Sequence, residues 1–308
     1  MTDLDKKLKK RWGRNFKDVR DWRTYNEQLI RRGEILIDLD FVKNWDEELE
    51  DMNVGKVGAP YQFPNSLIEL QAIWEAKNFP VRMIEGITRE LTELGNLPDY
   101  DSYSQISRRI KELGFSLEIP EENDLMIFSD GTGMQAVSGG EYLREKYDKK
   151  NRQWIQIVLL GDAKTHQPVS YEINLIPKSE SESTIRQVTR LLKKGVPIIA
   201  VGGDGAMDDK DLWNFCNDQG LQPIIKPDKN ARTDSDSPLR NQEVKARNKL
   251  GYKKWARQRG YGHRWTATEG MFSAIKRVFG EHIRATSDRG MVKETACKIW
   301  AYQKLQRA

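Results

Sequence analysis

Three acidic residues occur at positions from which they could hold divalent cations together. Asp130 closes the apolar run Leu125–Asp130, and Asp204 is flanked by glycines within Gly202–Gly205. Glu269 opens a segment whose apolar residues recur at helical spacing. Glycine neighbours leave a carboxylate unobstructed. Because converging carboxylates repel one another unless they share cations, and because Mg²⁺ prefers oxygen ligands, this pattern predicts an oxygen-ligated metal site.

The chemistry of such a site is phosphoryl transfer. Two Mg²⁺ ions about 3.5–4 Å apart activate the attacking oxygen and stabilise the leaving one, and Mn²⁺ is the alternative ion. Each carboxylate also has an ordinary interpretation. An Asp after a strand commonly caps a helix, and a Glu in a first helical turn complements the helix dipole. The metal site therefore depends on elements that bring the three residues together.

Strands and helices alternate in a definite order after Pro120. The patterns predict β-β-β-α-β-α-β, which is an α/β fold with a ribonuclease-H-like mixed sheet flanked by helices. In that fold the first and fourth strands are neighbours, so Asp130 and Asp204 would lie side by side, and a helix across the edge would bring Glu269. The predicted elements are Leu125–Asp130, Trp154–Leu160, Val169–Ile176, Thr184–Lys194, Pro197–Val201, Asp209–Asn217 and Leu221–Ile225, followed by closing helices at Glu269–Phe279 and Met291–Gln306.

The N-terminal region, residues 1–120, is predicted to be mainly helical, with one strand-like stretch at Glu34–Asp40. Arg108 and Arg109 lie on the expected exposed edge of the last helix. A helix-turn-helix-like DNA reader near residues 66–113 is one interpretation, and an ordinary helical subdomain is the other. The expected helices are one capped by Ser66, one opened by Pro80 and one over Ser104–Leu113.

Charge is unevenly distributed along the chain. The whole sequence carries +5, but residues 226–308 hold 20 Lys or Arg against 8 Asp or Glu, so the first 225 residues carry −7. A basic segment with interleaved aromatic residues indicates a nucleic-acid surface, and a solvated surface is the alternative. Residues 228–260 are predicted to be a mobile basic insertion, or a loop that leads into a helical tail, in a domain spanning residues 121–308.

Several classes of protein are excluded by composition. No run approaches the roughly 18 apolar residues of a membrane span. The polar, charged N-terminus lacks a signal core, so a cytoplasmic protein is expected. The two cysteines, Cys216 and Cys297, are far apart, and with three histidines they offer neither a zinc-ligand spacing nor a disulfide framework.

Three segments of the sequence resemble the DDE transposases of prokaryotic insertion sequences, in the IS-five-like group. FSDGTG (128–133) is similar to the first-aspartate motif, and VGGDGAMDDKDLW (201–213) to the second. YGHRWTATEGMFSAIKR (261–277) resembles the third, which in the family reads Tyr, two residues, Arg, three residues, Glu, six residues, Lys. This sequence has four residues between Arg264 and Glu269. WRTYNEQLIRRGEILIDLD (22–40), LPDYDSYSQISRR (97–109) and IIKPDKNAR (224–232) extend the resemblance over nearly the whole chain.

The resemblance implies a transposase that cuts and joins DNA. Asp130, Asp204 and Glu269 would be catalytic and would ligate two Mg²⁺ ions. Lys276, two helical turns after Glu269, shares its face. The implied partners are double-stranded DNA, as terminal inverted repeats and target, and further copies of the chain in a homodimer or larger oligomer on the nucleoid. The expected DNA contacts are Tyr261, Arg264, Lys276, Arg277, Lys226, Arg108 and Arg109.

Two other functions stay open from the sequence. A ribonuclease-H-like nuclease or junction resolvase would use the same carboxylates without joining strands. A catalytically silent copy would bind DNA as a regulator. Strand-transfer products from pre-cut DNA ends distinguish a transposase from both.

Overall fold

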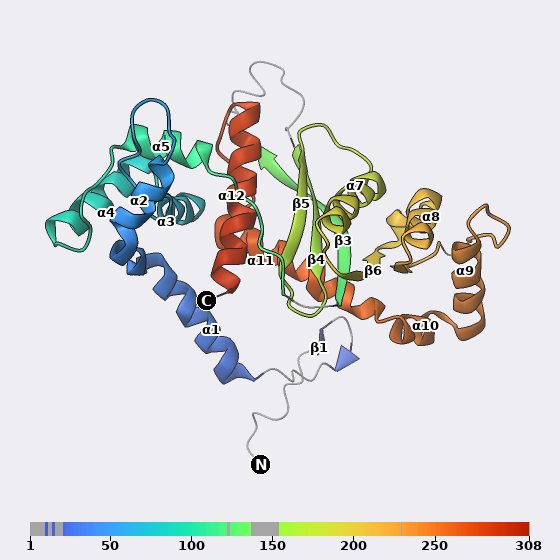
Figure 1. The fold of residues 1–308 in the computed structure, drawn as a ribbon. Helices are drawn as coiled ribbons and strands as arrows, with labels where there is room; N and C mark the ends of the chain where they lie inside the picture. The colour runs from blue at the N-terminus through green and yellow to red at the C-terminus, as the bar shows by residue number, and fades with distance from the viewer. Residues whose placement is uncertain are drawn as a thin grey trace, which may run out of the picture.

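A mixed sheet forms the centre of the computed structural model, which describes residues 10–11, 14–15, 21–121, 124–136, 154–228 and 230–307. Helix α12 lies between this sheet and the N-terminal helices (Figure 1). Helices α9 and α10 extend on the other side, beyond α8 (Figure 1). Among the described residues, no helix combines the length and the apolarity needed to cross a bilayer.

The described part of the sheet has six strands in the order β5-β4-β3-β6-β7, with β8 paired to the end of β3. Strand β4 runs antiparallel to both β3 and β5, whereas β6 is parallel to β3 and β7. This confirms the predicted mixed sheet and the predicted pairing of the first and fourth strands. The strands are β3 (Leu125–Ala136), β4 (Trp154–Asp162), β5 (Pro168–Asn174), β6 (Ile198–Gly203), β7 (Gln222–Ile225) and β8 (His282–Ile283). A separate pair joins β1 (Lys10–Arg11) to β2 (Arg14–Asn15).

Helices cover both faces of the sheet, because the strands are apolar on both sides. One face packs under α7 (Glu180–Lys193) and α8 (Lys210–Asp218). The other packs under α11 (Gly270–Phe279) and α12 (Asp288–Gln306). The predicted order of strands and helices is therefore confirmed.

The N-terminal helices share the core of the second face. Their apolar side chains join those of α11, α12 and strands β3 and β4 in one cluster that continues across residue 120. The contributing elements are the 3₁₀ turns η2 (Ile35–Ile37) and η3 (Asp40–Asn44), α2 (Trp45–Asn53), α3 (Asn65–Ala76), α4 (Val81–Glu93) and α5 (Tyr103–Glu112). Helix α1 (Trp22–Glu34) precedes them and has no buried residue.

Two local predictions in the N-terminal region are wrong. The stretch expected to be extended contains the 3₁₀ turn η2, because its side chains pack on α3 and the Trp74 indole donates a hydrogen bond to the Leu36 carbonyl at 2.8 Å. The residue Ser66 lies inside α3 rather than capping it. Its amide and hydroxyl instead donate to the Glu48 carboxylate.

The prediction of a mobile insertion at residues 228–260 is also wrong over most of that range. Residues 238–258 form α9 (Pro238–Leu250) and α10 (Tyr252–Gln258). The buried Glu243 carboxylate accepts a hydrogen bond from the Trp255 indole at 2.9 Å and pairs with Arg259 at 2.6 Å. These interactions, together with Pro238 at the first turn, stabilise helices where composition alone indicated a loop.

Candidate active site

Asp130 and Asp204 lie beside each other on adjacent strands. Phe128 of β3 pairs in parallel with Gly202 of β6, so two residues further along both strands bring Asp130 next to Asp204. The prediction that the strand ends at Asp130 is wrong. Strand β3 continues beside β4, and Asp130 pairs with Leu159. Asp130 therefore lies within β3, two residues beyond the last pair between β3 and β6.

Asp204 follows β6 and opens the short 3₁₀ turn η4 (Gly205–Met207). Its Oδ1 atom accepts a hydrogen bond from the Ala206 amide at 2.8 Å. The glycines before it are required by packing. A Cβ on Gly202 would lie 2.2 Å from the Phe128 ring, and one on Gly203 would lie 2.4 Å from the Met207 sulfur. The backbone that leads to Asp204 can therefore pack against Phe128 and Met207 only because residues 202 and 203 lack side chains.

Arg264 joins the first and third predicted carboxylates. Its guanidinium lies 2.6 Å from Glu269 Oε1 and 3.8 Å from Asp130 Oδ2, and its side chain is only 19% exposed. The Thr268 hydroxyl donates to the same Asp130 oxygen at 3.2 Å. Glu269 is therefore linked to Asp130 through Arg264. In this state Arg264 neutralises carboxylates, whereas the sequence predicted a contact with a DNA phosphate.

The extra residue between Arg264 and Glu269 is accommodated by a π-helical turn. This turn, η6 (Trp265–Glu269), follows the 3₁₀ turn η5 (Tyr261–His263) and leads into α11. The Gly270 amide donates to the Trp265 carbonyl, five residues back. A π-turn holds one residue more than an α-turn, so Glu269 stays on the face that Arg264 occupies.

A glycine on the neighbouring strand lets η6 approach the sheet. A Cβ on Gly161 of β4 would lie 1.9 Å from the Ala267 carbonyl oxygen. Any side chain at this position would push the π-turn away from the strands that carry Asp130. The position of Glu269 relative to the aspartates therefore depends on Gly161 as well as on the motif around Glu269.

Burial and charge act together on Asp130. Burial raises the pKa of Asp130, and the nearby Asp204 charge raises it further. The Gly131 amide, Arg264 and the Thr268 hydroxyl oppose this by stabilising the carboxylate. Burial and the neighbouring Asp204 charge thus disfavour the ionised form of Asp130, and a cation bound beside both aspartates would favour it.

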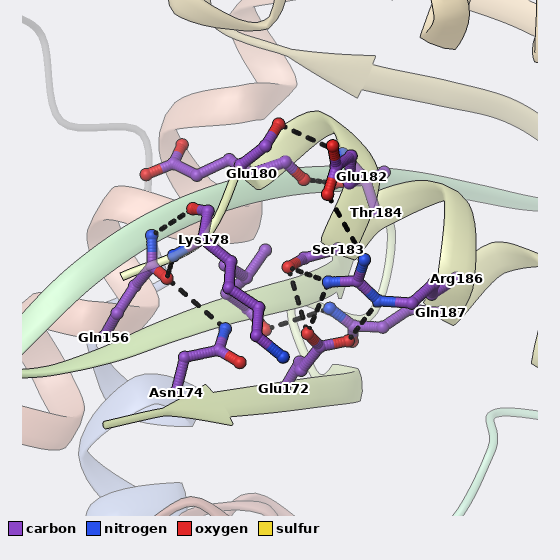
Figure 2. Close-up of polar contacts among 12 residues, drawn as sticks. Gln156, Glu172, Asn174, Lys178, Glu180, Glu182, Ser183, Thr184, Arg186 and Gln187 are labelled. Atoms are coloured by element: carbon purple, nitrogen blue, oxygen red, sulfur yellow. Dashed lines mark hydrogen bonds and ion pairs between the residues drawn. The ribbon is translucent and has the colours of Figure 1, made fainter. Parts of the chain in front are cut away.

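A fourth carboxylate, Glu180, lies against the backbone of β3 next to Asp130 and was missed by the sequence analysis. A Cβ on Gly131, the residue after Asp130, would lie 1.9 Å from Glu180 Oε1. Burial raises the pKa of Glu180, with further contributions from Asp130 and Asp204. Figure 2 shows Glu180 at the start of α7. The predicted helix began at Thr184. Ser179, whose hydroxyl caps the helix, was the signal for the earlier start.

Two of the predicted DNA contacts are buried. Tyr261 is 8% exposed, and its ring lies 5.5 Å from the Trp255 ring, so it anchors η5 in the core. Burial raises its pKa to about 12. Arg109 is 6% exposed and donates to Asn65 Oδ1 at 2.7 Å over the Tyr61 ring. These contacts remove both side chains from the surface, which corrects the expected exposed edge at Arg109.

The other predicted contacts are at or near the surface. Arg108 and Arg277 are exposed, and Arg277 donates to the Ser273 hydroxyl at 3.2 Å. Lys276 lies 3.9 Å from Glu281 Oε2. Lys226 follows β7, and its amine lies 3.9 Å from where a Cβ on Gly205 would stand, one residue from Asp204. Lys226 is therefore the predicted lysine placed beside an active-site aspartate.

The donor chemistry of the aspartate pair fits an oxygen-preferring divalent cation. Within the described residues, no three Asp, Glu, His or Cys side chains surround one point at which an ion could bind. Glu269 does not complete the set because Arg264 holds it. The arrangement therefore offers two neighbouring carboxylates, with two glutamates nearby.

The fold and site define an α/β protein with a mixed sheet flanked by helices and two aspartates side by side, one on β3 and one directly after β6. The family described as "Transposase DDE domain" matches residues 123–303, and a second family of the same description matches residues 30–139. Because the first match covers more than half of the chain, this protein belongs to the DDE transposases. It is accordingly a DNA-cleaving and strand-transferring enzyme, of a family that generally depends on divalent metals.

Among solved structures, the chain is similar to a piggyBac transposase in a synaptic complex with hairpin DNA. The two share 9% sequence identity, with a TM-score of 0.35. The similarity covers 90% of this chain and 73% of the other.

Proposed function

We propose that this chain is the transposase of an insertion sequence of the IS-five-like group. It binds the element's terminal inverted repeats, hydrolyses a phosphodiester at the tip to free a 3′-hydroxyl, and directs that hydroxyl onto target DNA. The observation that carries this proposal is the placement of Asp130 beside Asp204, with Arg264 and Glu269 brought to them by η6.

The aspartates would hold Mg²⁺, with Mn²⁺ as the alternative ion and Glu269 as a later ligand. Bound ions supply activation of the attacking oxygen and stabilisation of the leaving oxygen. The chain itself supplies position. The backbone of Asp130 is paired with Leu159 of β4, and the Thr268 hydroxyl donates to one of its carboxylate oxygens. Such pre-organisation is the protein's main contribution to phosphoryl transfer.

Arg264 has two alternative partners in this proposal. In the free protein its guanidinium neutralises Glu269 and Asp130. A DNA phosphate offers the same paired oxygen acceptors as a carboxylate. When DNA enters, Arg264 transfers to a phosphate and releases Glu269 toward the aspartates. DNA binding would thereby complete the acidic set.

The surface for DNA continues from η6 onto α9 and α10. These helices expose a series of cations that make no contact with the active-site carboxylates, and the Tyr252 ring is about half exposed among them. Exposed cations of this kind follow phosphates without reading sequence. The exposed cations are Lys245, Lys249, Lys253, Lys254 and Arg257.

A plasmid assay tests the proposal. The purified chain is given a supercoiled donor carrying the element's ends, or pre-cut ends with a target plasmid, in Mg²⁺. We expect nicking in the first case and joined products in the second. Asp204→Asn should reduce both by at least about 10²–10³-fold, because it removes a charge at the reacting centre. Asp218→Asn, at an exposed carboxylate on α8, is the matched control.

The other results identify the rival functions. Nicking without joined products identifies a nuclease, and binding of the ends without nicking by the wild-type chain identifies a silent regulator. Full activity of Asp204→Asn would overturn the assignment of the site.

A further inference from the structure

The acidic set of the active site has a member outside the three transposase motifs. We propose that Glu180, from the first turn of α7, ligates the divalent cation together with Asp130 and Asp204 before DNA is bound. This inference rests on the proposed function, because it adds a residue to the same site. It assigns the DNA-free ion to Glu180 and leaves Glu269 paired with Arg264.

The contact between Glu180 and β3 is possible only because residue 131 is glycine. Glu180 Oε1 lies 1.9 Å, and its carboxyl carbon 2.5 Å, from where a Cβ on Gly131 would be. Real atoms never approach a Cβ this closely, so the carboxylate occupies the space that any other residue at position 131 would fill. Gly131 directly follows Asp130. The Glu180 carboxylate therefore lies against the backbone of the first catalytic motif.

The first turn of α7 is attached to the same strand by buried hydroxyls. The Thr184 hydroxyl donates to the Glu180 carbonyl at 2.7 Å, and it lies 2.6 Å from the hydroxyl of Ser129. Ser129 and Thr184 are fully buried. Because Ser129 directly precedes Asp130, this contact fixes the backbone of Glu180 relative to that of the aspartate.

The nearest cation on α7 is used elsewhere. Arg186 pairs with Glu172 of β5 at 2.7 Å and lies 3.6 Å from Glu182. Figure 2 shows this group, with the Glu180 side chain directed away from the Arg186 guanidinium. Within the described part of the chain, no ion pair neutralises Glu180. Burial raises the pKa of Glu180, and the Asp130 and Asp204 charges raise it further.

The two glutamates approach the aspartates with different partners. Glu269 is held by a cation at 2.6 Å, whereas Glu180 is not. A carboxylate that is already neutralised by arginine must lose that partner before it can ligate a metal, but Glu180 needs only to rotate its side chain. In the described structure Asp130, Asp204 and Glu180 do not yet surround one point. The inference therefore requires the Glu180 side chain to rotate toward the two aspartates when the ion binds.

Binding of Mn²⁺ alone to the full chain, without DNA, tests this inference. Free Mn²⁺ is measured by electron paramagnetic resonance during titration. Loss of a ligand should weaken binding by at least about 10-fold, since even indirect supports of a metal site contribute that much. We expect this loss in Glu180→Gln. We expect it also in Gly131→Ala, which changes no charge but displaces the Glu180 carboxylate. Glu182→Gln is the matched control on the same helix and should bind like the wild type.

A second measurement separates ligation from a structural role. Without metal, Glu180→Gln should unfold at the same or a higher temperature than the wild type, because it removes a repelling charge. It should also lose the increase in unfolding temperature that Mn²⁺ gives the wild type. A lower unfolding temperature of Glu180→Gln without metal, with the Mn²⁺ increment kept, would overturn the inference.

The aspartate variant makes failure of the inference distinguishable from failure of the proposed function. If Asp204→Asn loses Mn²⁺ while Glu180→Gln and Gly131→Ala bind it like Glu182→Gln, the inference about Glu180 is wrong and the proposed site stands. If Asp204→Asn also binds Mn²⁺ like the wild type, the proposed site itself is wrong. Glu269→Gln should keep DNA-free binding. Its loss there would contradict the division of roles between the two glutamates.

Discussion

Asp101 carries a buried carboxyl group and lies outside the catalytic motifs. Its side chain is fully buried beside α3, and its Oδ1 atom accepts a hydrogen bond from the Gln71 amide at 2.6 Å. Its Oδ2 atom and Gln71 Oε1 have no hydrogen-bond partner. Burial raises the pKa of Asp101 to about 6, although Gln71 and the Arg109 charge act in the opposite direction.

Replacing Asp101 by asparagine should stabilise the protein at neutral pH. Because the folded pKa of about 6 exceeds the unfolded value of 3.8, the protonated form favours folding, and this stability is lost as pH rises from 3.8 through 6. Asp101→Asn should therefore be more stable than the wild type above pH 6, by up to about 3 kcal/mol. Urea unfolding between pH 4 and pH 8 measures the difference. It should shrink toward pH 4, where the wild-type carboxyl is protonated.

The control for loss of a charge is Asp51→Asn, at an exposed position on α2. Its difference from the wild type should change little over the same range. A stability difference for Asp101→Asn that is independent of pH would contradict the raised pKa.

At the scale of elements, the π-turn η6 decides how the third motif faces the other two. Residues five apart share a face in a π-turn, as Arg264 and Glu269 do here, whereas residues four apart share one in an α-turn. The extra residue is therefore compatible with the same contact. It changes the type of turn and leaves α11 in register.

Deleting Thr266 should convert η6 into an α-turn and keep the enzyme active. Thr266 is exposed, and its hydroxyl donates only to the His263 carbonyl, at 3.1 Å. The deletion places the glutamate four residues after Arg264, so the ion pair can re-form. We expect cleavage of plasmid donors within about tenfold of the wild-type rate, because removing the one extra residue of a π-turn gives an α-turn that keeps the arginine and the glutamate on one face.

Deletion of Ser273, an exposed residue of α11, is the comparison. It rotates Lys276 by about 100° relative to Glu269 and turns apolar residues out of the core. Cleavage should then be lost. Equal loss in both deletions would show that η6 is required as a π-turn.

At the scale of the whole molecule, α12 unites the N-terminal helices with the sheet. Its Trp300 ring lies 5.4 Å from the ring of Phe115. The Gln303 amide donates to the Glu118 and Pro168 carbonyls, at 2.7 and 2.8 Å. The N-terminal helices and the sheet therefore pack against the same helix.

Truncating Trp300 to alanine should destabilise the N-terminal helices and the catalytic sheet together. Removing a buried tryptophan costs about 3–5 kcal/mol, and the shared core implies one cooperative transition. Calorimetry, with circular dichroism as a second probe, should show a single transition at lower temperature. Trp154→Ala, at a tryptophan that is 48% exposed, should cost much less. Two separate transitions, only one of them shifted, would contradict a shared core.

The sequence by itself determined the order of strands and helices, because apolar runs and helical spacing are local properties of the chain. It also placed Asp130 and Asp204 together, since the order of strands implies which of them are neighbours. The three motifs were sufficient to indicate the transposase family. Each of these inferences uses only residues that are close in sequence or a topology that follows from their order.

The tertiary structure decided which side chains actually meet. Arg109 and Tyr261 are buried rather than presented to DNA, Arg264 pairs with Glu269, and Glu180 lies against Gly131. None of these follows from periodicity, because each depends on distances of a few ångströms between separately folded segments. A carboxylate becomes a ligand or an ion-pair partner according to what packs next to it, and that is set only when the helices close over the sheet.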